Sequence, residues 1–241
     1  RKPGRTPEGR AKLTVGDYSL YQADLAWSGP INDTWGVTAG GYYRESDGIR
    51  DPGYTADEGG QFRVNLLGQL SSGELEIFSK YINDRSLFVT PVPLEGSPSD
   101  PSAVGGRHAG TYAVSSEDLA RAGLPPSAAE VGLQNSNLED GIHPELFTIG
   151  ARLSWDFSDT LNLTNRFRYT DGDVRFDGIF TGDAPVAGTD FATDRGVAPA
   201  FSILGSGAAY DPAQLVQNHG HWAIGKEYEA TQNDLRLNLT A

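Results

Sequence analysis

The chain has 241 residues, with 19 Lys and Arg against 32 Asp and Glu, and a formal net charge of −13. This charge excludes a nucleic-acid backbone as the main partner, because phosphate binding needs clustered Lys and Arg. Cysteine is absent and no run of about 18 apolar residues occurs, which excludes disulfides, thiolate metal sites and membrane-spanning helices.

Alternation of apolar and polar residues recurs along the chain, and no stretch carries a helical stripe of useful length. The sequence therefore predicts an all-β fold. In chain order, we expect strands at 11–17, 19–28, 35–44, 61–70, 74–84, 146–157, 161–170 and 232–240. Most are about ten residues long, which suits a tilted membrane strand and is twice the usual globular length.

When the alternation is followed, one face of the predicted strands carries no charge. In residues 151–170, Trp155 and Leu163 fall on the uncharged face, and Arg152 and Arg166 fall on the other. A soluble sandwich would bury the apolar face against a second sheet, whereas a membrane barrel would turn it to lipid.

The connections discriminate between these two folds. After the second strand they alternate strictly between short and long: 29–34, 45–60, 71–73, 85–145, 158–160 and 171–231. Outer-membrane barrels alternate in this way, because their periplasmic turns are tight and their extracellular loops are long. Trp27 and Trp35 flank the first short turn, and Tyr43, Tyr81 and Tyr169 lie next to long loops, like the aromatic girdles of a barrel. The pattern favours an antiparallel transmembrane β-barrel.

Residues 1–54 resemble the junction between plug and barrel in TonB-dependent outer-membrane receptors, where a Lys-Pro step closes the plug. The turn Ser-Gly-Pro-Ile-Asn-Asp-Thr at 28–34 and the segment Gly-Gly-Tyr-Tyr-Arg…Asp-Gly-Ile-Arg at 40–50 are characteristic. The resemblance implies a 22-stranded barrel with a plug in its lumen. It also implies ligand-gated import of a scarce nutrient with energy passed on by TonB, the cargo being a ferric siderophore, corrinoid, glycan or aromatic compound.

The sequence departs from that pattern because it has no plug domain, no TonB box and too few strands. We therefore expect 1–10 to be the plug-to-barrel junction and 11–241 to be a partial barrel of about eight strands, with long extracellular loops near 85–145 and 171–231. The implied location is the bacterial outer membrane. The implied partners are outer-membrane lipid and lipopolysaccharide, the receptor's own plug and remaining strands, TonB acting through the plug, and an unidentified small molecule. No enzymatic activity, cofactor or metal is expected.

The long loops of such receptors usually cover the ligand entrance. Four residues at or within them are predicted ligand contacts: Arg44, Tyr54, His108 and Tyr112. Further aromatic candidates are Phe180, Phe191, Phe201 and Tyr210. Four arginines on the charged face are predicted to line the lumen and face the plug: Arg63, Arg152, Arg166 and Arg168. They could attract an anionic ligand or pair with acidic groups of the plug, and the sequence leaves both open.

Two motifs carry ionisable groups in suggestive spacing. His219 and His221 share a face and could ligate a metal, but no third ligand is evident, so a loop-surface role is favoured. Glu74 and Glu76 could act as an acid–base pair, but at the base of a barrel wall we expect them to face water or the plug.

Two loop segments carry local signals. The acidic stretch 51–58 could hold a divalent cation, although a solvated turn is favoured. Segment 115–132 begins with a Ser-x-x-Asp cap, which predicts a short helix. The alternative functions are a secreted β-sandwich hydrolase or carbohydrate-binding domain, and a small self-contained barrel with a structural or adhesive role.

Overall fold

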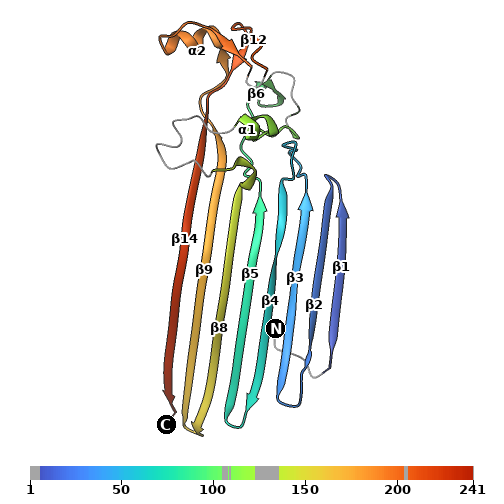
Figure 1. The fold of residues 1–241 in the computed structure, drawn as a ribbon, viewed down its shortest axis with the longest axis vertical. Helices are drawn as coiled ribbons and strands as arrows, with labels where there is room; N and C mark the ends of the chain where they lie inside the picture. The colour runs from blue at the N-terminus through green and yellow to red at the C-terminus, as the bar shows by residue number, and fades with distance from the viewer. Residues whose placement is uncertain (1–5, 105–107, 109, 123–135, 204–205, 241) are drawn as a thin grey trace.

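The computed structural model describes residues 6–104, 108, 110–122, 136–203 and 206–240. Its main element is one eight-stranded antiparallel sheet. The strands of this sheet lie side by side in the order in which they occur along the chain. Figure 1 shows the eight strands side by side. In order across the sheet they are β1 (Glu8–Gly16), β2 (Leu20–Pro30), β3 (Trp35–Ser46), β4 (Asp57–Leu70), β5 (Gly73–Ser86), β8 (Ile142–Ser158), β9 (Leu161–Thr181) and β14 (His219–Leu239).

All eight predicted strands are confirmed, but the last two are longer than predicted. β9 continues to Thr181 and β14 begins at His219, so the connection expected at 171–231 narrows to 182–218. The reason is visible in the sequence phase. Before Tyr169 in the chain the apolar residues of β9 have odd numbers, whereas Val174 and Phe176 after it have even numbers. The pairing of β9 with β14 nevertheless continues without a register shift.

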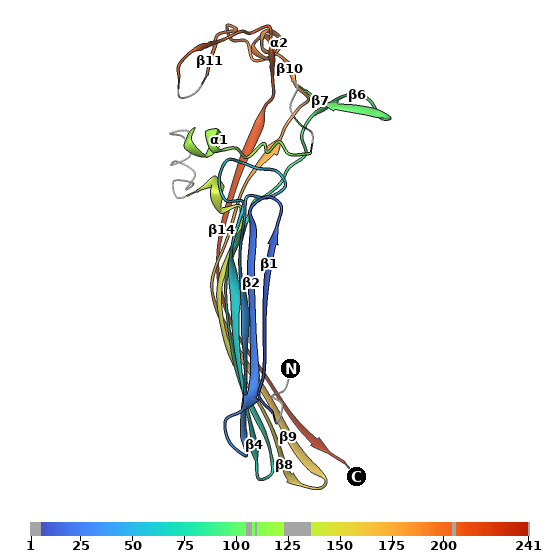
Figure 2. The same cartoon turned by 90° about the vertical axis from the view of Figure 1, so that its right-hand side faces the viewer.

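The sheet is a single layer. Figure 2 shows it edge-on as one curved wall, and among the described residues neither a second sheet nor a long helix covers it. Leu25 is 63% exposed and Leu237 is 65% exposed on the apolar face. The sandwich alternative is therefore wrong, because it requires a second layer over this face.

The pairing confirms the predicted apolar face. Leu66 lies opposite Val37 on one side and Ile77 on the other, and Leu153 lies opposite Leu75. Directly opposed residues of antiparallel strands share a face, so these side chains form one continuous apolar band across the sheet.

The two ends of the sheet differ. At one end, the turn end, the connections are 31–34, 71–72 and 159–160; at the other, the loop end, they are 17–19, 47–56, 87–141 and 182–218. In the first turn the Asn32 side chain accepts hydrogen bonds from the backbone N–H groups of Thr34 (3.0 Å) and Trp35 (2.8 Å). The short elements gather at the loop end (Figure 1): β6 (Leu94–Ser97), β7 (Asp100–Ala103), α1 (Glu117–Ala122), a 3-10 turn (Leu138–Asp140), β10 (Val186–Ala187), α2 (Gly188–Asp194), β11 (Phe201–Ser202), β12 (Ala209–Tyr210) and β13 (Leu215–Val216).

The short helix expected within 115–132 is α1; residues 123–132 lie outside the described part of the chain. In the part that is described, none of the helices has both the length and the apolar character needed to cross a membrane. The buried core is small and lies at the loop end, where Val114, Leu138 and Ile179 pack together.

Candidate functional site

Arg44 lies on the polar face near the loop end of β3. Its Nε donates to Asp84 (3.0 Å), another guanidinium nitrogen donates to the Ser86 hydroxyl (2.7 Å), and that nitrogen is also 3.5 Å from Asp57. The Tyr42 hydroxyl donates to the second oxygen of Asp84 at 2.6 Å. The charge of this predicted ligand contact is therefore already met by two carboxylates of the sheet.

The other predicted contacts lie in the loops. The Tyr54 hydroxyl donates to the Ser115 carbonyl at 3.3 Å, and burial raises the pKa of Tyr54 to about 12, so the phenol remains protonated. Arg50 donates to the Tyr112 carbonyl at 3.0 Å, which ties loop 47–56 to the longer loop. His108 is exposed.

The four predicted lumenal arginines are all exposed on the polar face: Arg63, Arg152, Arg166 and Arg168. Glu76 lies opposite Arg152, Asp234 lies opposite Arg166, and Arg152 and Arg166 also lie opposite each other. The sheet thus places carboxylates in register with two of the arginines. Whether an anionic ligand or a plug meets the remaining charge stays a prediction.

A buried carboxyl group holds the loop end together. Asp177 is 4% exposed; it accepts a hydrogen bond from the Ser136 hydroxyl and lies 3.2 Å from His221 Nε2. Burial raises the pKa of Asp177, while its bonds to Ser136 and His221 oppose that shift. This is not a nucleophilic triad, because the same imidazole nitrogen faces both Ser136 (3.2 Å) and Asp177. The contact fastens Ser136, and with it the buried Leu138, to the ends of β9 and β14.

Four aromatic rings cluster where the loops meet the sheet. The Phe88 ring centroid is 4.8 Å from that of Phe176 and 5.1 Å from that of Phe180, and Phe180 is 5.5 Å from Trp222. The sequence predicts Phe180 in a loop, but it lies in strand β9. Trp222 is 58% exposed, so the cluster presents an aromatic surface on which planar ligand groups can stack.

The two longest loops enclose a cavity of about 570 Å³, which is within the range of small-molecule sites. We call it the loop cavity. Its lining is Val92, Pro93, Ala103, Val104, Tyr112, Val114, Pro185, Tyr210, Ala213, Gln214, Leu215, Val216, Gln217 and His219. It brings together the predicted candidates Tyr112 and Tyr210. The other two, Phe191 and Phe201, contact each other instead, at 6.3 Å between ring centroids.

The glutamines of the loop cavity had no sequence signal, since isolated amides in a loop belong to no motif. His219 lines the cavity and His221 faces Asp177, so the two imidazoles have different environments. Among the described residues no group of three or more His, Asp or Glu side chains is arranged to hold a metal ion. In stretch 51–58, the Asp51 carboxylate accepts from the Gly53 N–H at 2.7 Å, which confirms a turn there.

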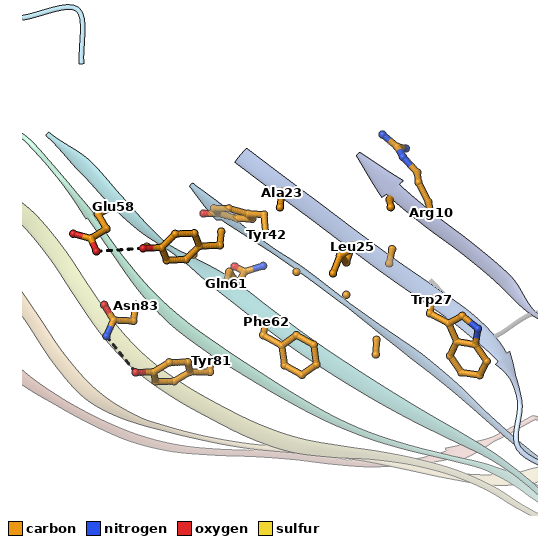
Figure 3. A pocket seen from close by; sticks show the side chains of 18 of the residues that line it. Arg10, Ala23, Leu25, Trp27, Tyr42, Glu58, Gln61, Phe62, Tyr81 and Asn83 are labelled. Atoms are coloured by element: carbon orange, nitrogen blue, oxygen red, sulfur yellow. Dashed lines mark hydrogen bonds between the residues drawn. The ribbon is translucent and has the colours of Figure 1, made fainter. Parts of the chain in front are cut away.

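A wide groove of about 1230 Å³ lies on the apolar face over β1 to β5 (Figure 3). Ala23 and Gly41 contribute little side-chain volume to its lining, which also includes the larger rings of Trp27, Phe62 and Tyr81. This groove belongs to the apolar face and is lined mainly by apolar groups, in contrast to the loop cavity.

Comparison with solved structures identifies proteins of similar fold. The ferric-catecholate import receptor Fiu from E. coli K12 aligns over 98% of this chain at 15% identity, with TM-scores of 0.57 in its closed form and 0.56 in its open form. FpvA from P. aeruginosa, bound to a heterologous pyoverdine, aligns over 77% at 14% identity and a TM-score of 0.52. No family model and no curated protein sequence matches the chain.

Fiu and FpvA are TonB-dependent receptors, so the fold agrees with the resemblance found in the sequence. The chain covers only 29% and 32% of the two Fiu structures and 22% of FpvA. At this identity the likeness establishes the fold: an antiparallel β-barrel wall, of which this chain supplies eight strands in an open sheet. The matched proteins are transport receptors and not enzymes, in agreement with the expectation from sequence.

Proposed function

We propose that this chain forms part of the wall, and the ligand-facing loops, of a TonB-dependent importer in the bacterial outer membrane. The apolar face contacts lipid, the polar face lines the lumen, the turn end is periplasmic and the loop end is extracellular. Transport by such a protein requires a plug and TonB, which supply the moving part and the energy. The residues of this chain would bind and guide a ligand without making or breaking covalent bonds.

The observation that carries this proposal is the slope of a row of tyrosines. Tyr21, Tyr43, Tyr81 and Tyr169 lie on the apolar face near the loop ends of their strands. The row of paired residues that starts at Tyr21 reaches β9 at Arg175, six residues beyond Tyr169 and five strand spacings away. At about 3.4 Å per residue and about 4.8 Å per strand spacing, the tyrosine row is inclined by about 40° to the paired rows.

That angle is the one a membrane imposes. Strands of transmembrane barrels are tilted by about 35–45° from the barrel axis, so a flat lipid–water boundary must cut obliquely across their paired rows. A soluble sheet has no reason to order its tyrosines along such a line. Below the row the apolar face carries Leu66 and Leu153, whereas above it the same face carries Glu145 and Asp171.

Two measurements on the full-length protein test the proposal. Fractionation of the native host should place the protein in the outer membrane, and detergent should be needed to extract it. A deletion strain should lose uptake of one scarce nutrient, and an uncoupler of the inner-membrane proton gradient should abolish the same uptake in the parent. Recovery in the aqueous phase, or uptake that ignores the uncoupler, would contradict the importer.

A further inference from the structure

The loop cavity contains polar groups but no charge among its described lining residues. Of its side chains, those of Tyr112, Tyr210, Gln214, Gln217 and His219 can form hydrogen bonds, and the rest are apolar. A site of this kind selects a ligand by hydrogen bonding and shape, because it offers no formal charge to balance one on the ligand.

Two of these groups already donate a hydrogen bond within the loops. The Tyr210 hydroxyl donates to the Leu215 carbonyl at 2.8 Å, and the Gln217 amide nitrogen donates to the Asp183 carbonyl at 2.9 Å. A phenol oxygen and an amide oxygen can still accept a hydrogen bond after donating one. Both side chains keep accepting capacity, and Gln217 also keeps one amide N–H, so a ligand with hydroxyl or amide N–H donors can be bound here.

His219 keeps this lining neutral. Burial lowers the pKa of His219, and its Nδ1 atom is buried without a partner among the described residues. Protonating the ring would put a positive charge in this buried lining and would require Nδ1 to donate where no acceptor among the described residues faces it, so the imidazole is uncharged at neutral pH.

The loops around the cavity are acidic. The connection 87–141 contains seven Asp and Glu against two Arg, and the connection 182–218 contains four Asp against one Arg. In a protein of net charge −13, this end of the molecule repels anions, and a polyanionic ligand would need a local cationic site to overcome the field. The described lining of the loop cavity supplies none.

We propose that the loop cavity binds an uncharged ligand rich in hydroxyl and amide donors, and that it rejects polyanions. The inference rests on the proposed function, since it names the class of ligand that the importer takes. A neutral ferric hydroxamate and a neutral oligosaccharide both have this chemistry, whereas a ferric tris-catecholate, with its three negative charges, does not.

The test is calorimetric titration of the full-length receptor in detergent with a neutral ferric trihydroxamate, maltotriose and a trianionic ferric tris-catecholate. At least one neutral probe should bind, with a Kd that changes less than about twofold between about 50 and about 500 mM salt, because no charge is screened. The two neutral probes separate an iron chelate from a sugar as the source. Binding by neither neutral probe, or by the catecholate alone, overturns the proposal.

Variants tie the binding to the cavity. Gln214→Leu should weaken the neutral probe about tenfold, the effect of losing one hydrogen-bonding partner from a desolvated site. Gln69→Leu is the matched control, since this exposed amide lies at the turn end and should leave the Kd unchanged. Gln214→Lys should allow the catecholate to bind. Equal Kd values for Gln214→Leu and the parent protein would overturn the proposal.

The outcomes for the ligand class and for the importer are distinct. A receptor that resides in the outer membrane, depends on the proton gradient and binds only the catecholate would keep its proposed function and refute the ligand class. A protein that is absent from the outer membrane would refute both.

Discussion

The two halves of the β9–β14 hairpin carry different kinds of residue on the same face. In the half near the turn end, Leu163 and Leu237 lie opposite each other on the apolar face. In the half beyond Tyr169 the same face places Asp171 opposite Glu229. Like charges in direct opposition destabilise a sheet, and only water makes them tolerable. Strand propensity does not explain this change within one uninterrupted pair of strands, whereas the proposed passage from lipid to water does.

The largest effect should come from placing a charge in the apolar half. Leu66→Arg should destabilise the full-length receptor by about 2–4 kcal/mol in phosphatidylcholine bilayers, because the guanidinium would lie in hydrocarbon. Denaturant titration of the bilayer-inserted protein measures this free energy of unfolding. Asn65→Arg, one residue away on the polar face, is the control and should cost about 1 kcal/mol or less. Equal costs for the two variants would contradict the assignment of the faces.

A smaller effect is expected at the buried carboxyl of the loop half. Asp177→Ala removes the carboxylate that Ser136 and His221 both contact and should lower the free energy of local opening by about 1–3 kcal/mol. Hydrogen exchange of residues 136–140 measures it. Asp171→Ala, which removes an exposed charge opposite Glu229, should be neutral or slightly stabilising. Unchanged exchange in Asp177→Ala would show that the contact does not fasten the loop.

The loop half should also respond to pH. Burial holds the pKa of His219 below its ordinary value of 6.5, so the unfolded chain binds the proton more readily than the native loop. Stability of the loop cavity should be fully present above about pH 6.5 and should fall as the pH drops through the native pKa. Hydrogen exchange of residues 214–219 at about pH 7 and about pH 5 measures this. His219→Gln should reduce the dependence, and His108→Gln, an exposed control, should not.

The smallest effect is expected on the polar face of the wall. Arg152 is exposed between Glu76 and Arg166, so attraction and repulsion largely offset each other. Arg152→Met should change the free energy of unfolding by about 1 kcal/mol or less. A loss well above that value would show that Arg152 has a stronger partner in the assembled receptor, which would favour the plug or an anionic ligand as that partner.

The strands were predictable because successive side chains point to opposite faces of the sheet. One face is apolar and the other polar, so the sequence alternates. The predicted end of β9 was wrong. After Tyr169 the apolar residues move from odd to even positions, and this break in the alternation resembles the end of a strand. Following the alternation of charges, Asp171, Asp173 and Arg175, would have recovered the continuation.

The candidate site was less predictable because it depends on contacts between distant segments. Tyr112 and Tyr210 were found as loop aromatics, but nothing local shows that they line one cavity. Arg44 was chosen for its charge and its position near a loop. That Asp57 and Asp84 already neutralise it follows only from the pairing of β3 with β4 and of β4 with β5.

A wall one layer thick has no interior, and this restricts how its sequence can drift. Neighbours such as Leu66 and Asn65 point to opposite faces of the wall. A scan of all substitutions along β4 should therefore tolerate apolar and polar residues at alternate positions. In β9 and β14 the positions that tolerate apolar residues should exchange with those that tolerate polar residues at the level of Tyr169. The measured tolerance to substitution would then locate the proposed lipid–water boundary to within about two residues.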